Sequence, residues 1–378
     1  MNQLIPKKIR KVLKNRLLLL YNIFDKKYIT SKEFVEPVKQ YRSFFAKINF
    51  PSGLHYLMKQ KLLPYDNKKK SLEKDFIINV FENVYIDMES GTLITDDRKI
   101  ISQSLKYQTF PTITMNSKLD DFLEITDENV SVITSHFKAR YYHIWFDAIV
   151  KLFHLSRADS KITIAISEEA PAVYHQILKC FEDIFQIRII KDYRFIKVRN
   201  AHVVHHKNWA KHAPVITPEI SEFFKKKILF GKGNFNYKRI YIKRKNGGRD
   251  ILNEDEVEAE FVKYGFELIS FEDYSIFEQA QIISNAEVIA GLHGAGFTNL
   301  IFSHPGQTVI EMQNHAVVPT FFFISYQLGL KYIPIFSLTT TPDFLKQSYK
   351  GRKDFYKEKL KPVKYDVNEV ENILKMNL

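Results

Sequence analysis

The sequence predicts an α/β protein built from two successive doubly wound domains. Short apolar runs bounded by turn residues alternate with segments of helical periodicity. The alternation stops at a polar connection around Pro214 and Pro218 and then begins again. The 378 residues are enough for about two domains. We therefore expect two mostly parallel sheets covered by helices, with a ligand between the carboxyl ends of the two sheets.

The first domain is placed at residues 76–215, behind a basic N-terminal segment at 1–75 that precedes this domain or packs on it. Helical periodicity covers residues 140–155 and 170–185. A turn is expected at Glu89-Ser90-Gly91, between the first two strands. The predicted strands are 76–86, 91–94, 130–134, 161–166, 187–191 and 195–204.

The second domain is placed at residues 216–378 and repeats the alternation. Asn253, with Glu256 three residues later, predicts a capping box at the start of one helix. The predicted helices are 218–229, 253–264, 274–285, 319–328 and 367–375. The predicted strands are 239–242, 266–271, 288–290, 308–312 and 332–336.

Composition narrows the class of protein. A hydrophobic content of 45% with 14% aromatic residues can bury large cores, which excludes global disorder. One cysteine, Cys180, excludes an internal disulfide framework and indicates a reducing compartment, so we expect a cytoplasmic protein. No stretch has the roughly 20 apolar residues that a membrane-spanning helix needs.

The formal charge of +13 favours anionic partners. Six basic residues precede Asp25, so residues 1–24 are interpreted either as a peripheral contact with the inner face of an anionic membrane or as a solvated basic helix. Zinc-finger, helix-turn-helix and RNP patterns are absent from the sequence, so no nucleic-acid partner is expected.

A glycine-rich turn organises the second domain. Gly291, Gly294 and Gly296 lie between an apolar strand and the start of a helix, a layout that directs free backbone N–H groups at a phosphate. The spacing is neither Gly-x-Gly-x-x-Gly nor a Walker A loop, and a tight turn without a ligand is the alternative. His293 inside the turn and Glu311 near the end of the next strand favour a nucleotide diphosphate site.

Two further groups of residues could act on such a ligand. His143 and Asp147 are four residues apart, so on a helix they share a face and suit proton transfer, unless that face is merely solvated. We assign Asp147 as the base and His143 as its orienter, because an aspartate is ordinarily ionised at neutral pH, and the reverse assignment stays open. The second group consists of four basic residues in the loop after a strand: Lys243, Arg244, Lys245 and Arg249. They could bind phosphate oxygens, or the loop could be merely solvated.

The sequence offers little for a metal ion. His202, His205, His206 and His212 match no zinc-binding spacing, and no Asp-x-Asp occurs. We expect neither a metal nor a cofactor, so that N–H groups and basic side chains would neutralise a diphosphate.

Three pieces of the chain, taken in order, resemble a known family. The three pieces look like glycosyltransferase family 61. They are Tyr-Tyr-His-Ile-Trp-Phe-Asp at 141–147, Tyr-Ile-Lys-Arg at 241–244 and His-Gly-Ala-Gly-Phe-Thr-Asn-Leu-Ile-Phe at 293–302. Its bacterial members are often labelled capsular polysaccharide biosynthesis proteins. The likeness covers about residues 76–340.

The resemblance implies a GT-B fold, in which two Rossmann-like domains face each other across a cleft, with the acceptor mostly in the first and the donor in the second. It implies inverting, metal-independent transfer from a nucleotide-diphosphate sugar, the co-substrate, to a saccharide or lipid-linked saccharide in surface polysaccharide biosynthesis. Arg244 would neutralise the leaving group and Glu311 would bind ribose hydroxyls. The residues assigned to the donor site are His293, Gly294, Ala295, Gly296, Thr298, Asn299, Arg244, Arg249 and Glu311.

Two positions depart from the family's pattern. Lys243 stands where a serine is usual, and Ile144 where bacterial members often have tryptophan. These departures leave the donor sugar and the acceptor open. The alternative function is a nucleotide-sugar or anionic-glycan binding protein without catalysis.

Overall fold

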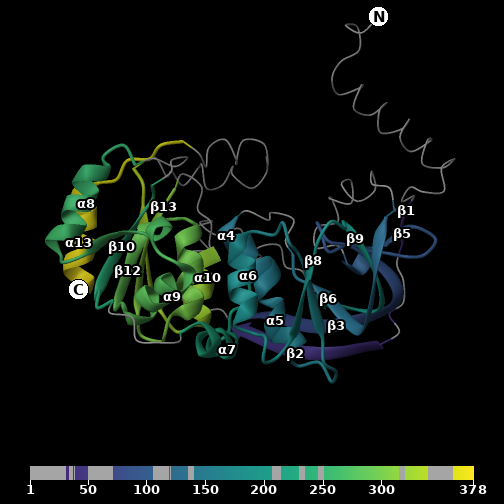
Figure 1. Ribbon diagram of the computed structural model, residues 1–378. Coiled ribbons are helices and arrows are strands. Elements are labelled where there is room, and N and C mark those ends of the chain that lie inside the picture. The colour runs from purple at the N-terminus through teal and green to yellow at the C-terminus, as the bar shows by residue number, and fades with distance from the viewer. Residues whose placement is uncertain are drawn as a thin grey trace, which may run out of the picture. The chain divides into compact units, whose positions relative to one another are not determined.

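The chain divides into two compact units, Met1–Phe45 with Asp75–Lys207 (unit 1) and Ala46–Lys74 with Asn208–Leu378 (unit 2). The computed structural model describes residues 31–33, 37, 39–49, 71–104, 119, 121–134, 140–206, 214–229, 235–245, 251–314, 320–338 and 361–378 (Figure 1). No helix within these stretches combines the length and the apolar character needed to cross a membrane. The basic segment at 1–24 lies outside the described residues.

Unit 1 is built on a sheet whose described part has nine strands in the order β1-β5-β4-β3-β9-β6-β7-β8, with β2 beside β3. Its core gathers on β3, β6 and β9, where Phe81, Ile125 and Ile196 are buried together. The strands are β1 Ser31–Glu33, β2 Lys39–Asn49, β3 Ser71–Asp87, β4 Leu93–Ile94, β5 Lys99–Ile101, β6 Phe122–Val132, β7 Thr163–Ser167, β8 Gln186–Ile190 and β9 Phe195–His206.

The sheet of unit 1 is mixed, so the prediction of a mostly parallel sheet is correct for only part of it. β9, β6, β7 and β8 run parallel, whereas β3 is antiparallel to both β4 and β9. The reason is the short turn that joins β3 to β4, because a tight turn can join only antiparallel strands. β6 begins at Phe122, whereas the predicted strand began at residue 130. The prediction missed the first half of β6 because that half alternates between exposed and more buried positions and lacks an apolar run.

The helical segment predicted at 140–155 is present but not uniform. It consists of α4 Tyr141–His143, a π-helix at Ile144–Ile149 and α5 Lys151–Leu155. The Val150 N–H donates to the Trp145 carbonyl at 2.9 Å, which is the five-residue spacing of a π-helix. The next helix, α6, covers Ala172–Lys179 and ends before the predicted residue 185.

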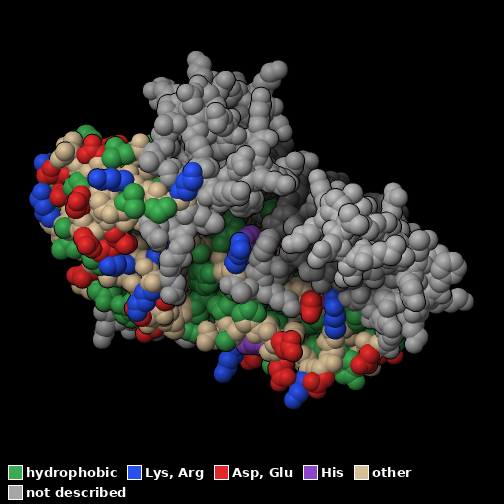
Figure 2. All heavy atoms as spheres, turned by 90° about the horizontal axis from the view of Figure 1, so that it is seen from above, with side chains coloured by type: hydrophobic (Ala, Val, Ile, Leu, Met, Phe, Trp, Pro, Cys, Tyr) green, Lys and Arg blue, Asp and Glu red, His purple; other side chains and the backbone are tan. Residues whose placement is uncertain are grey.

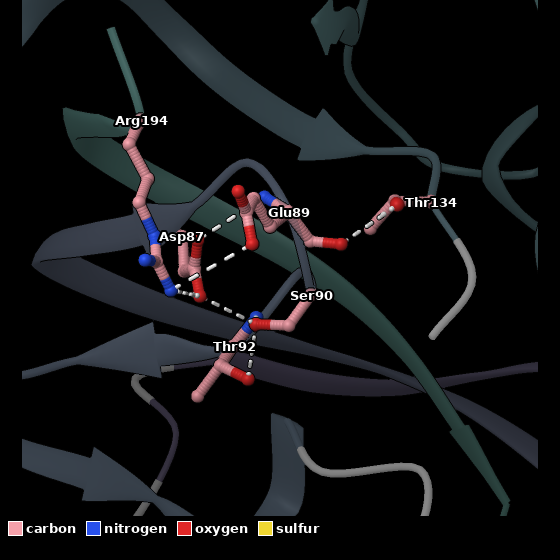
Figure 3. Close-up of polar contacts among 6 residues, drawn as sticks. All are labelled: Asp87, Glu89, Ser90, Thr92, Thr134 and Arg194. Carbon is pink, nitrogen blue, oxygen red and sulfur yellow. Dashed lines mark hydrogen bonds and ion pairs between the residues drawn. The ribbon is translucent and has the colours of Figure 1, made fainter. Parts of the chain in front are cut away.

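A buried aspartate fixes the turn between β3 and β4 (Figure 3). The Asp87 carboxylate is fully buried and accepts hydrogen bonds from Ser90 Oγ at 2.9 Å and from the Glu89 N–H at 3.1 Å. Arg194 donates to it from Nε and Nη2, both at 3.2 Å. Thr134 Oγ1 donates to the Glu89 carbonyl at 3.2 Å, which ties the turn to the end of β6.

Asp87→Ala should therefore destabilise unit 1 by about 2–4 kcal/mol, because it leaves Arg194 and two turn donors without their acceptor. Removing one partner of a fully buried ion pair costs about 3–5 kcal/mol of stability. We expect a loss at or below the lower end of that range, because the Arg194 side chain remains 32% exposed. Urea denaturation measures the loss. Asp97→Ala is the control, because its pair with Lys99 is solvent-exposed and should contribute less than about 1 kcal/mol. Equal losses in the two variants would contradict a structural role for Asp87.

Unit 2 is built on a sheet of five described strands, all parallel, in the order β11-β10-β12-β13-β14. This arrangement confirms the doubly wound prediction for this part of the chain. The strands are β10 Arg239–Lys243, β11 Glu267–Ser270, β12 Val288–Leu292, β13 Thr308–Gln313 and β14 Lys331–Phe336. The helices are α7 Pro218–Ile228, α8 Glu254–Lys263, the 3-10 helix η3 Phe271–Asp273, α9 Ile276–Asn285, the 3-10 helix η4 Ala295–Phe302, α10 Thr320–Gln327 and α13 Val367–Asn377.

The helices of unit 2 cover both faces of its sheet. On one face α8 and α13 pack over Tyr241, Ile310 and Ile335, and on the other lie α9 and α10 (Figure 1). Strand residues alternate between these faces. Val288, Ala290 and Leu292 therefore face α8 and α13, while Gly291 and Glu311 face the α10 side.

The surface at the α8 and α13 end carries both signs of charge. Figure 2 shows lysine and arginine side chains interspersed with aspartate and glutamate over this end, at the left of the view. Glu371 accepts from Lys263 at 2.9 Å and from Lys375 at 2.8 Å, and these hydrogen bonds, with Lys375 first, lower its pKa to about 2. The positive net charge is therefore not gathered into a basic patch here.

The predicted capping box at α8 is wrong, and a true one caps α9. Asn253 precedes α8, but its side chain bonds the main chain of Tyr365, with Nδ2 to the carbonyl at 3.0 Å and Oδ1 to the N–H at 3.2 Å. A parallel β-bridge between Ile251 and Val363 places the segment that holds Tyr365 beside the residues that precede α8. At α9, Ser275 and Glu278 exchange both capping hydrogen bonds.

Candidate functional site

The strand order of unit 2 reverses between β10 and β12, which are neighbours in the sheet. In open parallel sheets, ligands bind outside the carboxyl ends of the strands at such a reversal. β10 ends at Lys243 and is followed by Arg244, while β12 ends at Leu292 and is followed by His293. Arg244 and His293, both predicted for the donor site, thus lie at the strand ends where this topology places a ligand.

Arg244 lies directly over the glycine turn. Its Nη2 donates to the His293 carbonyl at 2.8 Å. A Cβ added at Gly294 would lie 1.8 Å from the same Nη2, so only glycine leaves room for the guanidinium. Burial lowers the pKa of Arg244, but an arginine stays charged throughout the physiological range. The structure therefore holds a half-buried positive charge against the turn.

The other two glycines allow β12 and η4 to approach β10. A Cβ at Gly291, where φ is +154°, would lie 2.9 Å from the Ile242 carbonyl oxygen. A Cβ at Gly296 would lie 2.9 Å from Ile242 Cγ2. Ala295 is exposed and Gly296 is half-buried, so the N–H groups at the start of η4 belong to the accessible part of the turn.

His293 and Glu311 form a buried pair beneath the turn. His293 Nδ1 lies 2.5 Å from Glu311 Oε1, and the two side chains are 6% and 0% exposed. The Tyr332 hydroxyl donates to Glu311 Oε2, and Gln313 Nε2 donates to the Tyr332 hydroxyl at 2.8 Å. Burial, with the charge of Glu311 second, raises the pKa of Tyr332 well above its ordinary value, so the phenol stays protonated.

Glu311 stands at the end of β13, as predicted, but its carboxylate points beneath the turn. Both of its oxygens already have partners, and the side chain is fully buried. These contacts favour a role in orienting His293. The binding of ribose hydroxyls by Glu311 stays a prediction.

The remaining donor-site residues differ in accessibility. Thr298 and Asn299 are fully buried in η4, and Asn299 Nδ2 donates to Gln279 Oε1 of α9 at 2.9 Å. In the basic loop, Lys243 pairs with Glu258 at 2.7 Å and Lys245 pairs with Asp273. The other predicted residue of this loop, Arg249, lies outside the described residues. Of the loop's described basic side chains, Arg244 is the one that contacts the glycine turn.

A second histidine–carboxylate pair lies in unit 1. His143 Nδ1 is 2.6 Å from Asp147 Oδ2, so the predicted shared face brings the two side chains into direct contact. Asp147 is 7% exposed and His143 is 20% exposed. Asp147 belongs to the π-helix, a conformation that is rare and is frequently found at functional sites. Tyr142 packs edge-on against His143 and Phe146 and supports the histidine ring.

Of the histidines considered as metal ligands, His202 is the one whose side chain the structure describes. His202 Nε2 lies 3.0 Å from the Asn129 side-chain oxygen, and burial lowers the pKa of His202 to about 4. The side chains of His205 and His206 and all of His212 lie outside the described part. Within that part, no group of three histidine, cysteine, aspartate or glutamate side chains could hold a metal ion.

Tyr332 is the site residue that sequence reasoning missed. It is the second residue of β14 and pairs with Val309 of β13. Paired residues point to the same face of a sheet and so do residues two apart along a strand, so Tyr332 lies on the face of Glu311. That conclusion requires the register between the two strands.

Comparison with known proteins relates the segment that holds these features to a family. Residues 141–310 match the sequence model of Glycosyltransferase 61, a span that holds the His143–Asp147 pair, Arg244 and the glycine turn. The EGF domain-specific O-linked N-acetylglucosamine transferase of Drosophila melanogaster is 34% identical over 77 residues, which are 20% of this chain and 15% of that protein. Over residues 141–310, slightly less than half of its length, the chain is thus similar to glycosyltransferase family 61.

Proposed function

We propose that the protein is an inverting glycosyltransferase that moves a hexose or pentose from a nucleotide-diphosphate sugar to a saccharide or lipid-linked saccharide acceptor in surface or capsular polysaccharide biosynthesis. The proposed organisation is of the GT-B type, with the donor site in unit 2 and the acceptor site in unit 1, in a cytoplasmic protein peripheral to the membrane. One observation carries the proposal. A half-buried arginine lies over the glycine turn at the strand-order reversal of a parallel sheet, in a chain whose residues 141–310 match the model of Glycosyltransferase 61.

The glycine turn would hold the sugar diphosphate. The N–H groups of Ala295 and Gly296 stand at the start of η4, where free donors collect. Arginine has five N–H donors in a planar fork, so Arg244 can hold the His293 carbonyl and still meet phosphate oxygens. Negative charge grows on the departing diphosphate, and fixed donors that face this charge lower the barrier without reorganising.

The contact in unit 1 favours the reverse assignment, with His143 as the base and Asp147 as its orienter. Asp147 is the more buried member and its carboxylate contacts Nδ1, so the more exposed His143 is the residue proposed to act on the acceptor. In this arrangement the carboxylate fixes the tautomer and stabilises the imidazolium that forms. His143 would take the acceptor hydroxyl proton while the oxygen attacks the anomeric carbon and the bond to the diphosphate breaks, which inverts the configuration.

A panel of nucleotide sugars tests the function. The native protein should be stabilised against heat by one of them, because a ligand that binds only the folded state raises its stability by mass action. The panel should include an N-acetylglucosamine donor, since the Drosophila relative is named as an N-acetylglucosamine transferase. Lys245→Ala, in the same loop but paired with Asp273, is the control and should respond like wild type.

Turnover then separates catalysis from binding. Release of the nucleoside diphosphate in the presence of a saccharide acceptor is the expected result. Stabilisation by a nucleotide sugar without transfer to any acceptor tested would favour the alternative of a binding protein. Absence of stabilisation by every nucleotide sugar would contradict both the transferase and a nucleotide-sugar binding protein.

We predict that transfer activity survives a chelator. Arg244 and backbone N–H groups are the proposed counter-charges for the diphosphate, and the sequence has no Asp-x-Asp to hold a metal there. Activity measured with and without excess EDTA should agree within about 2-fold. A loss that Mn²⁺ or Mg²⁺ restores would show that the diphosphate is held by a metal.

A further inference from the structure

One side-chain amide of α9 connects two segments beside the glycine turn. Gln279 Nε2 donates to the main-chain oxygens of Phe271 at 2.8 Å and of Tyr274 at 2.9 Å, at the two ends of η3. Gln279 Oε1 accepts from Asn299 Nδ2 of η4 at 2.9 Å. Both the donor and the acceptor side of this amide therefore take part in joining η3 to η4.

Both segments adjoin the proposed diphosphate site. η4 begins at Ala295 and Gly296, whose N–H groups are the proposed donors, and Asn299 lies about one turn further along this helix. From the η3 side, the ring of Phe271 packs beside Gly296, since a Cβ added at Gly296 would lie 3.4 Å from Phe271 Cδ2. A shift of η3 or of η4 would therefore move the edge of the glycine turn.

η3 also brings a negative charge near Arg244. Burial lowers the pKa of Arg244, and the charge of Glu272 opposes that shift. Glu272 follows Phe271 in η3, so the segment held by Gln279 acts on Arg244 as well as on the start of η4. One amide is thus connected to both proposed counter-charges of the diphosphate, the arginine and the N–H groups.

The two segments need such a connection because of their type. Both are 3-10 helices, whose hydrogen bonds have poorer geometry than those of an α-helix, and runs longer than three or four residues are uncommon. η4 has eight residues. By contrast, the first turn of α9, which carries Gln279, is closed by the capping box of Ser275 and Glu278. We therefore expect α9 to be the firm element and η3 and η4 to depend on it for their positions.

We infer that Gln279 is a positioning residue, which holds η3 against the start of η4 so that the N–H groups of the glycine turn and Arg244 meet the sugar diphosphate at fixed places. This inference rests on the proposed function for the identity of the ligand. The connection between the two segments is a property of the protein alone. Misplacement of a site by about 1 Å can lower a rate about 10²-fold, so loss of this connection should be measurable in kcat.

Unit 2 supplies a matched control in Gln307. Its Nε2 donates to the main-chain oxygens of Ile283, at 2.7 Å, and of Ala286, and its Oε1 accepts from the His304 N–H at 2.9 Å. Gln307 precedes β13, so it lies at the amino ends of the parallel strands, opposite the glycine turn. Gln279→Met and Gln307→Met each remove the hydrogen bonds of one such amide and keep a side chain of similar length. A general role in folding predicts the same consequences for both.

Amide hydrogen exchange of the full chain, without a ligand, tests the connection. Gln279→Met should speed exchange at residues 271–274 and 295–299, because local opening exposes their N–H groups. Gln307→Met should leave these residues as in wild type and should speed exchange at 283–286. Both variants should lower Tm.

Kinetics below the Tm of every variant test the consequence for the reaction. Only Gln279→Met should lower kcat, by about 10- to 100-fold. KM for the nucleotide sugar should change less than kcat, because the charge on the diphosphate is greatest as the sugar departs. Gln307→Met should keep kcat within about 2-fold of wild type.

Gln279→Glu is a second variant that separates the two halves of the connection. A carboxylate can still accept from Asn299, but it has no hydrogen to donate to the carbonyls of η3. Exchange should therefore rise more at residues 271–274 than at 295–299. This variant also keeps the test available if Gln279→Met does not fold.

Exchange at 271–274 that stays at the wild-type rate in the Gln279 variants would overturn the inference, and so would equal kcat in Gln279→Met and Gln307→Met. The exchange measurement needs no substrate, so it is independent of the proposed function. Wild type that turns over no nucleotide sugar would contradict that function. Selective exchange in η3 and η4 would still support the connection through Gln279 in that case.

Discussion

Replacing His143 by glutamine should lower kcat by about 10²–10⁴-fold, the usual contribution of a general base. Donor affinity should stay nearly unchanged, because the donor site is proposed in unit 2 and His143 belongs to unit 1. Asp147→Asn should cause a similar loss of kcat, since an amide in place of the carboxylate no longer stabilises the imidazolium and favours the wrong tautomer. Steady-state kinetics with saturating donor measure both effects.

The two variants also decide which residue is the base. His304→Gln, at an exposed histidine of unit 2, is the control and should keep wild-type kcat. Strong activity in His143→Gln with none in Asp147→Asn would restore the first assignment, with Asp147 as the base. Activity retained by both variants would place the base elsewhere and make the π-helical segment structural.

The strands of unit 2 were predicted more accurately than those of unit 1, because they are buried on both faces. The strands of unit 2 are parallel and covered on both faces, so every residue of β12 and β13 is buried and most of their residues are apolar. Only the buried end of β6 appears as an apolar run, and its exposed half was missed. The π-helix was not predictable, because a change of one residue in hydrogen-bond spacing does not alter apolar periodicity over so short a segment.

The candidate site shows a similar limit. The motif placed His293 and Glu311 near each other, and the four-residue spacing placed His143 beside Asp147, but neither pattern states which side chain is buried. The burial of Asp147 favours His143 as the base, and the contacts of the buried Glu311 favour a role in orienting His293. Tyr332 required the register of two strands that no local pattern contains. A local sequence pattern can thus identify the chemical groups of a site, whereas the contacts between these groups depend on how separate strands align.

Arg244→Ala should lower kcat by about 10²–10³-fold, the cost of removing one preorganised donor from a developing negative charge. Donor affinity should fall less, because the charge on the diphosphate is greatest as the sugar departs. Gly294→Ala should reproduce part of this loss, since its Cβ would lie 1.8 Å from Arg244 Nη2 and must displace the guanidinium. The backbone at Gly294 is extended, with φ −175°, so strain does not explain the effect.

A double-mutant cycle separates displacement of Arg244 from other effects of the added methyl group. Once alanine replaces Arg244, the methyl group at residue 294 meets no guanidinium, so Gly294→Ala should then cost less than about 2-fold in kcat. Gly306→Ala is the matched control, because its φ of +93° strains alanine although no neighbouring atom is within 4 Å. It should lower Tm without lowering kcat. Equal costs of Gly294→Ala with and without Arg244 would show that the two residues act independently and would remove Arg244 from the glycine turn's function.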